Sequence, residues 1–204
     1  MQIKLDSLTE AQTYFTMTQT IMPRPIAWVL SENEDASLNL APFSYFNAVC
    51  TDPPLVMVSI NLQDDGSEKD TLRNIRQRSQ FVIHIASDNQ LDELNQSAAT
   101  LAPGESEVTA SGLLTTAFEG YDMPRLSDCK IALMCERHQI QAIGNKGQTL
   151  LFAEVKEIYL ADDCAEVNEK GRLKVFAYNV QPLARLGAGE YGSFGDILNA
   201  ARPS

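Results

Sequence analysis

Two long β-prone segments joined by a glycine turn constrain the fold of this chain most strongly. Residues 131–143 and 149–160 are rich in aliphatic and β-branched side chains, and the sequence GNKG at residues 144–147 separates them. This pattern predicts two antiparallel strands joined by a hairpin. Shorter strands are expected over residues 23–30, 38–43, 52–60, 81–85 and 113–118, where β-branched and apolar residues also dominate.

The expected helices are fewer than the strands. We predict one over residues 9–18, with Ser7 and Glu10 at capping-box spacing, one over residues 69–78, one over 89–99 and a short one over 105–110. The strands cluster in hairpins and do not alternate regularly with helices. The sequence therefore favours a mainly β fold, an antiparallel barrel or sandwich with added helices, over a doubly wound parallel sheet.

Charge and composition exclude several functions. The net charge of -11 over 204 residues argues against nucleic acid and against an anionic membrane surface as partners. We find no signal peptide and no apolar stretch long enough to span a membrane. The four cysteines are widely spaced and form no C-x-x-C pair, which is typical of reduced thiols in a cytoplasmic protein.

Residues 39–47 (NLAPFSYFN) combine three aromatic rings, a proline and neutral polar groups, without any charge. Two interpretations of this segment remain open. It is either part of the hydrophobic core, or one wall of a site for a flat ring with a polar edge.

The segment from Ser67 to Arg76 (SEKDTLRNIR) follows a predicted strand and turn and opens a helix, with Ser67 or Asp70 as the N-cap. Lys69 lies at the first turn, where the helix dipole disfavours a cation unless an anion binds there. Free N–H groups, the dipole and a lysine together favour phosphate. The alternative is a solvated helix face on which Asp70 pairs with Arg73.

Other motifs carry less weight. The literal G-x-G-x-x-G at residues 187–192 is rejected as a dinucleotide fingerprint, because no βαβ unit can follow in the remaining residues, and its glycines are expected in a C-terminal tail. His84 and His138 lie far from other metal ligands, and His84 is expected to be a satisfied core residue. No catalytic residue pair is evident, so a phosphorylated ring cofactor that brings its own chemistry fits the sequence best.

Five motifs in order resemble one family. These are PRPIAWV at residues 23–29, NLAPFSYFN at 39–47, DPPLV at 52–56, KDT at 69–71, and RLG at 185–187 with Tyr191. Together they resemble the flavin reductase-like family of FMN-binding split barrels, to which flavoredoxins also belong. The resemblance implies a six-stranded Greek-key split β-barrel that forms a homodimer, with FMN bound non-covalently near the subunit interface. It also implies one domain, with a helical arm over about residues 1–20, a barrel over about 21–186 and a tail over about 187–204.

The resemblance further implies which residues bind FMN. The ring is expected to contact Asn39, Ala41, Pro42, Phe43, Ser44 and Asn47, partly through backbone groups of Ala41, Phe43 and Ser44, while Tyr45 helps to shape the pocket. The phosphate is expected near Ser59, Lys69, Asp70 and Thr71, while Arg24 either assists the phosphate or is structural, and Arg185 and Tyr191 lie near the site. The chain departs from the family pattern at Cys50, where serine is common, and in the acidic loop after Ile60.

The activity implied by the resemblance is that of an NAD(P)H-dependent flavin oxidoreductase. NADH or NADPH would pass hydride to flavin N5, and the reduced flavin would then reduce free flavin or an acceptor protein. The alternative is a flavoredoxin-like electron carrier, or a flavin-binding protein without nicotinamide turnover. A dimeric scaffold that has lost FMN is disfavoured by the intact segments at residues 39–47 and 69–71.

Overall fold

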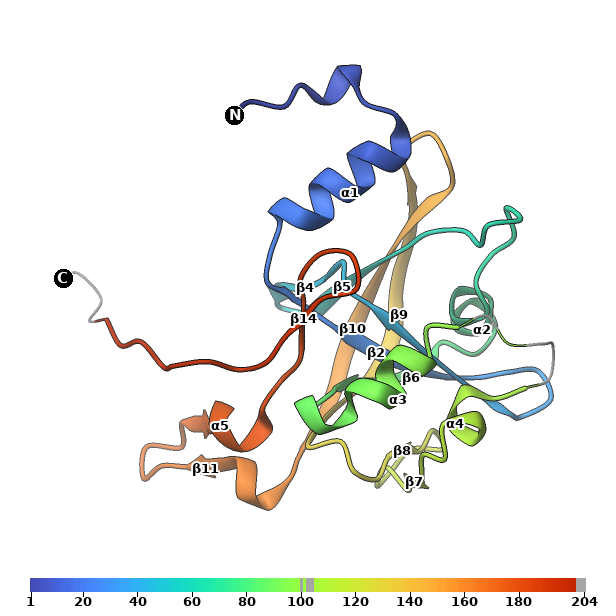
Figure 1. Ribbon diagram of the computed structural model, residues 1–204. Helices are drawn as coiled ribbons and strands as arrows, with labels where there is room; N and C mark the ends of the chain where they lie inside the picture. Colours follow the sequence, from blue (N-terminus) through green and yellow to red (C-terminus); the bar gives the residue numbers. More distant parts are fainter. Residues whose placement is uncertain (100, 102–104, 201–204) are drawn as a thin grey trace.

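An antiparallel sheet of seven strands forms the centre of the protein (Figure 1). The structure is a computed structural model that describes residues 1–99, 101 and 105–200. Its strand order is β3-β2-β6-β9-β10-β5-β4. The strands are β2 (Ala27–Glu32), β3 (Leu38–Phe43), β4 (Phe46–Thr51), β5 (Pro54–Ile60), β6 (Gln80–Ile85), β9 (Ile131–Ile143) and β10 (Gln148–Leu160). The long hairpin predicted from the glycine turn is confirmed as β9 and β10. The sheet has one strand more than the six that the resemblance implied, because residues 46–51, which were not predicted, form β4.

The sheet curves around an apolar interior. One cluster of buried side chains takes members from β2, β3, β5, β6, β9 and β10, so these six strands face a common centre. Leu72 and Ile75 of α2 (Asp70–Arg78) belong to the same cluster, which places this helix over the interior. The inner cluster consists of Ala27, Val29, Phe43, Val56, Val58, Ile60, Leu72, Ile75, Phe81, Ile83, Cys135, Leu151 and Ala153.

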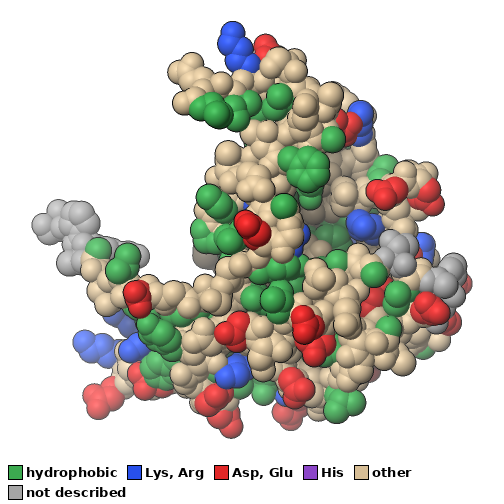
Figure 2. Space-filling model, viewed as in Figure 1, with side chains coloured by type: hydrophobic (Ala, Val, Ile, Leu, Met, Phe, Trp, Pro, Cys, Tyr) green, Lys and Arg blue, Asp and Glu red, His purple; other side chains and the backbone are tan. Residues whose placement is uncertain are grey.

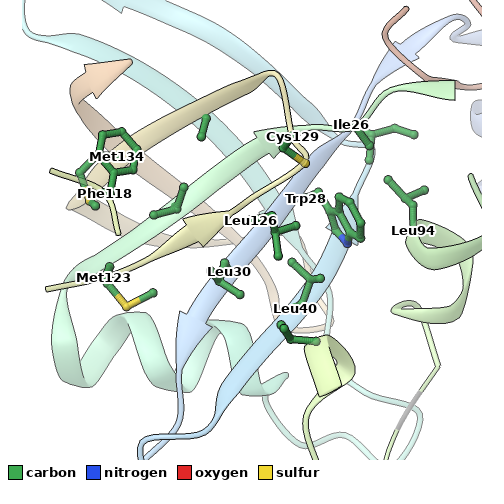
Figure 3. Close-up of a cluster of buried hydrophobic side chains, with 14 of the residues drawn as sticks. Ile26, Trp28, Leu30, Leu40, Leu94, Phe118, Met123, Leu126, Cys129 and Met134 are labelled. Carbon is green, nitrogen blue, oxygen red and sulfur yellow. The ribbon is translucent and has the colours of Figure 1, made fainter. Parts of the chain in front are cut away.

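A second apolar cluster covers the outer face of β2 and β6 (Figure 3). Trp28 and Leu30 of β2 point into it, whereas Ala27 and Val29 of the same strand point into the inner cluster. The alternation of a strand places neighbouring side chains on opposite faces, so β2 is buried on both sides. Leu94 of α3 (Leu91–Gln96) and Val108 of α4 (Glu107–Ala110) cover this outer face, and the Trp28 indole donates to the Ser97 hydroxyl at 2.8 Å.

The helices begin close to where the sequence predicts them. α1 (Glu10–Thr20) is capped by Thr9, whose side chain accepts from the Gln12 N–H while Gln12 bonds back to Thr9. The predicted capping box of Ser7 with Glu10 is therefore wrong. The same sequence pattern recurs at Thr9 and Gln12, and the helix is capped there. α3 covers only part of the predicted residues 89–99, with a 3₁₀ turn η2 (Asp88–Gln90) before it. The other short helices are η1 (Leu5–Ser7), η3 (Asp162–Cys164) and α5 (Ala177–Val180).

Small sheets complete the fold. β1 (Arg24–Pro25), β13 (Ala184–Arg185) and β14 (Tyr191–Gly192) form one of three strands, while β7 (Thr115–Thr116) pairs with β8 (Arg125–Leu126) and β11 (Ala165–Val167) with β12 (Leu173–Val175). Gly187 and Gly189 are loop glycines, as expected, and they lie in the turn that leads from β13 into β14, whereas Gly192 belongs to β14. The predicted strand over residues 113–118 is reduced to β7. No helix among the described residues is long and apolar enough to cross a membrane.

His84 joins three segments of the outer cluster. Its Nδ1 lies 3.2 Å from the Trp28 carbonyl oxygen, and its Nε2 accepts from the Leu126 N–H at 2.9 Å. Because Nε2 accepts, Nδ1 carries the proton and donates to Trp28. Complete burial lowers the pKa of His84 to about 3. The prediction of a satisfied core histidine is confirmed.

We expect this burial to make the protein less stable as the pH falls. The unfolded chain takes up a proton at His84 near pH 6.5 and the folded chain does not until about pH 3, so stability is full above 6.5 and declines below it. The decline should reach about 1.4 kcal/mol per pH unit. Urea unfolding at pH 5.5 and 7.5 would measure it. The His84→Gln variant should lose the difference in unfolding free energy between the two pH values. The His138→Gln variant, changed on the exposed part of β9, should keep that difference. Equal stability of the native chain at pH 5.5 and 7.5 would contradict this prediction.

Candidate functional site

A groove runs along the outer edge of β3 and continues beneath α1. It has three adjoining recesses, which we name by their contents. The helix recess lies at the start of α2 and is lined by Asn39, Ala41, Pro42, Phe43, Asn61, Gln63, Lys69, Asp70, Thr71, Ser97, Ala98, Ala99, Leu101 and Glu107. The aromatic recess shares Pro42, Phe43 and Asn61 with it and adds Glu10, Ala11, Tyr14, Phe15, Ser44, Tyr45, Ser59 and Gln148. The arginine recess shares Tyr14, Phe15 and Ser44 with the aromatic recess and adds Thr18, Arg24, Arg185 and Ala188.

β3 is an edge strand whose outer side is partly covered by the segment before α4. The Glu107 carboxylate accepts from the Leu40 N–H at 3.0 Å, and the Ser106 hydroxyl donates to the Leu38 carbonyl. Backbone groups alternate in direction along a strand, so Pro42 also faces outward, where its missing N–H leaves no donor unpaired. The peptide groups of Ala41 and Phe43 face β2 instead, which leaves only their side chains for a ligand.

A buried polar network joins the start of β3 to the start of α2. The Asn39 amide donates to the Thr71 hydroxyl at 2.9 Å and to the Ser31 hydroxyl at 3.2 Å. The Asn74 amide donates to Ser31 at 3.2 Å and to the Asn33 side-chain oxygen at 2.7 Å. Asn39, Thr71, Ser31 and Asn74 are all buried. The two motifs that the sequence suggested separately, residues 39–47 and 69–71, are therefore in direct contact.

The start of α2 has no side-chain cap. Lys69 occupies the N-cap position and forms no capping hydrogen bond, so the expectation that Ser67 or Asp70 caps this helix is wrong. The Leu72 N–H bonds the Lys69 carbonyl at 3.0 Å, but within the described residues the N–H groups of Asp70 and Thr71 have no acceptor. A helix start of this kind attracts an anion, because its free N–H groups lie at the positive end of the dipole.

The arginines of α2 are paired, and Lys69 is not. Arg73 pairs with Asp70, Arg76 pairs with Glu68 at 3.0 Å, and Arg78 pairs with Glu32 at 2.9 Å. The solvated-face interpretation thus holds for these three cations. Lys69 is half-buried at the helix recess and forms no ion pair with any residue that the structure describes. It is the cation of this segment that remains available to a ligand.

The aromatic recess places ring side chains from two segments around neutral polar groups. Phe43 is only 7% exposed and belongs to the inner cluster, while partial burial raises the pKa of the Tyr45 hydroxyl. Tyr14 and Phe15 of α1 pack edge to face, with ring centroids 5.8 Å apart, and both are more than half exposed. The Ser59 hydroxyl accepts from the Gln148 amide at 2.6 Å, so Ser59 lies here and not in the helix recess with Lys69.

Arg24 has a structural role, which was one of its two expected roles. It is only 5% exposed. Its guanidinium donates to the carbonyls of Thr18 at 2.6 Å, Ile21 at 2.5 Å and Leu186 at 2.5 Å, with a longer contact to the Ser44 hydroxyl at 3.4 Å. These bonds tie the end of α1 to the β13–β14 hairpin and give each nitrogen of the Arg24 guanidinium a partner.

The remaining predicted residues divide between the groove and its surroundings. Arg185 lines the arginine recess and stacks on the Tyr191 ring at 4.3 Å. Tyr191 itself lines none of the three recesses, and its hydroxyl contacts Asn95 at 3.3 Å. Asn47 is exposed on β4, where its side-chain oxygen accepts from the Ala48 N–H at 2.9 Å, and it lies outside the recesses.

Several groove residues were missed by sequence reasoning. They are Asn61 and Gln63 after β5, Gln148 at the start of β10, Tyr14 and Phe15 of α1, and Glu107 of α4. Asn61 directly follows a predicted strand, and residues at strand ends often line sites, which is the one signal that was present. Burial raises the pKa of the Glu107 carboxyl, although the Leu40 N–H opposes that effect. Within the described part of the chain, no group of three or more His, Cys, Asp or Glu could hold a metal ion.

Comparison with known proteins agrees with this fold. The profile of the flavin reductase like domain matches residues 17–177. Nitrilotriacetate monooxygenase component B from Bacillus cereus is 31% identical, with a TM-score of 0.89 over 98% of each chain. The 2-nitrobenzoate 2-nitroreductase of Pseudomonas fluorescens is 30% identical, with a TM-score of 0.87 over 100% of this chain and 96% of that one. A split-barrel protein of Shewanella frigidimarina, 16% identical, shares the fold with a TM-score of 0.85 over 100% of both chains. The fold is thus a split β-barrel, as predicted.

We expect Arg24→Gln to destabilise the protein by about 2–4 kcal/mol, because three carbonyls lose a charged donor. Urea unfolding would measure the loss, and hydrogen exchange should show faster opening of α1. Arg172→Gln, which removes the same charge from the exposed turn between β11 and β12, is the matched control. Unchanged stability of the Arg24 variant would contradict the structural role.

Proposed function

This chain belongs to the flavin reductase like domain family, and from that premise we propose that it binds FMN and transfers electrons from NADH or NADPH to free flavin or an acceptor protein. The observation that carries the proposal is the open start of α2, with an unpaired lysine, at one end of a groove whose middle is aromatic. The groove supports a ligand with an anionic end and a flat ring. Two similar solved chains are named as a monooxygenase component and a nitroreductase, which supports an oxidoreductase.

The residues of the helix recess fit a phosphate. The free N–H groups of Asp70 and Thr71 would donate to phosphate oxygens, and the Lys69 ammonium would balance the charge. The Thr71 hydroxyl already accepts from Asn39, so its own proton is available for an acceptor in the recess. Asp70 is held away from the phosphate by its pair with Arg73, which reduces the repulsion between two anions.

The aromatic recess fits the ring of the same cofactor. Phe43 and Tyr45 offer apolar faces, while Asn61, Ser59 and Ser44 offer uncharged donors and acceptors to a polar ring edge. Bound FMN would supply the two-electron chemistry at its N5 atom. The chain itself would hold the ring in place, limit the access of water to one face and set the entry of the second substrate.

We also propose that the protein acts as a homodimer. β4 is a sheet edge whose residues are mostly exposed, and apolar side chains with exposed fractions of 49–59% lie on it and directly after α1. They are Val49 on β4, and Ile21 and Met22 after α1. An unpaired edge beside exposed apolar side chains favours association with a second copy.

The purified protein tests the main proposal directly. We expect the visible absorbance of bound flavin, and we expect NADH or NADPH, added without oxygen, to bleach it. A colourless protein that does not take up added FMN would rule out the flavin proposal. Bound flavin that stays oxidised with both nucleotides would instead indicate an electron carrier or a flavin-binding protein without nicotinamide turnover.

We expect Lys69→Ala to weaken FMN binding about 10- to 100-fold, because one charged hydrogen bond to the phosphate is lost. The folded protein should remain, since Lys69 belongs to neither apolar cluster. Fluorescence titration of the flavin-free protein with FMN would measure the change, and Lys170→Ala on the turn before β12 is the matched control. Equal affinity of the two variants would refute the phosphate assignment.

A further inference from the structure

The arginine recess contains a guanidinium nitrogen that lacks a partner. Arg185 stacks on Tyr191 and donates through one nitrogen to the Ala188 carbonyl. Its other terminal nitrogen, Nη1, is buried and has no hydrogen-bond partner among the described residues. A buried charged donor without an acceptor is costly, so its presence in a groove points to a ligand that supplies the acceptor.

The charge of the recess also favours an anion. Two arginines line it, and none of the described lining residues is a carboxylate. This is unusual in a chain with a net charge of -11, whose acidic side chains are scattered over the whole face in Figure 2. Every guanidinium nitrogen of Arg24 has a hydrogen-bond partner, whereas Arg185 has a buried nitrogen without one among the described residues.

The recess lies at the end of the groove opposite the start of α2. It shares Tyr14, Phe15 and Ser44 with the aromatic recess and no lining residue with the helix recess. If the FMN phosphate binds at Lys69 and the ring lies in the aromatic recess, Arg185 is beyond the ring. A molecule that meets the ring from this side would bring its own anionic group to Arg185.

We propose that Arg185 binds the anionic group of the second substrate, whose flat part lies between the aromatic recess and the side chains of Tyr14 and Phe15. This inference rests on the proposed function. The anionic group is either the carboxylate of a small aromatic acceptor or the pyrophosphate of the nicotinamide donor. Both are oxygen anions that accept from a guanidinium, and Arg185 offers the two N–H groups of one desolvated nitrogen to either.

The experiment uses FMN-loaded protein and compares Arg185→Gln with Arg172→Gln. Flavin content is measured first and is expected to be equal in both. For the carboxylate, the probe is benzoate, whose binding to oxidised protein is followed by the flavin spectrum. For the pyrophosphate, the probe is the rate of anaerobic flavin reduction by NADH, by NADPH and by 1-methyl-1,4-dihydronicotinamide, which lacks the pyrophosphate.

We expect Arg185→Gln to weaken the binding of one of the two probes about 10- to 100-fold, because one charged hydrogen bond is lost. A higher Kd for benzoate identifies a carboxylate. A higher KM for NADH or NADPH, with unchanged reduction by the truncated donor, identifies the pyrophosphate. Arg172→Gln should change neither.

Three results would overturn the inference. Unchanged benzoate binding together with unchanged KM for both nucleotides excludes an anion at Arg185. Loss of flavin from Arg185→Gln assigns this residue to the cofactor. A native protein that binds no FMN defeats the proposed function and this inference with it.

If Arg185→Gln does not fold, the native protein is tested with benzoate against benzamide and with NADH against the truncated donor. Equal affinity for benzoate and benzamide, together with equal KM for NADH and the truncated donor, would also overturn the inference.

Discussion

The hydrogen bond from the Asn39 amide to the Thr71 hydroxyl is the contact on which the groove depends. It joins the edge strand β3 to the first turn of α2 at 2.9 Å, and both residues are buried. A buried hydrogen bond of this kind is costly to break, because both polar groups would lose it without gaining water in its place. The bond therefore fixes where the open helix start lies relative to Pro42 and Phe43. Because the Thr71 hydroxyl accepts from Asn39 in this bond, its own proton points toward another acceptor.

Burial of the central strands on both faces of the sheet stabilises the position of β3 and α2. β2 sends Ala27 and Val29 into the inner cluster and Trp28 into the outer one. The outer cluster in turn holds the segments around α3 and α4 in place, and these contribute Ser97 and Glu107 to the helix recess. The Trp28 indole bonds Ser97 directly. Packing on the side of the sheet away from the barrel interior thus shapes one wall of the groove.

Much of this was predictable from the sequence, because the signals were local. The glycine turn at residues 144–147 predicted the β9–β10 hairpin, and the run after Gly66 predicted α2 with Lys69 at its first turn. Contacts across long stretches of chain left no such signal. The carbonyls that Arg24 binds lie on both α1 and the β13–β14 hairpin, and the Leu40 N–H finds its acceptor 67 residues away at Glu107. Local rules also could not choose between two overlapping capping boxes, at Ser7 and at Thr9.

Arg24 and Arg185 show why residue type alone could not assign the site. Both are arginines that line the same recess. Arg24 donates to three carbonyls at the end of α1 and in the β13–β14 turn, and these bonds make it part of the frame. Arg185 donates to one carbonyl and stacks on one ring, and its Nη1 has no acceptor in the part of the chain that the structure describes. The same logic separates Lys69 from the paired arginines of α2. In this groove, the cations available to a ligand are those that the fold leaves without acceptors, and only three-dimensional contacts decide which these are.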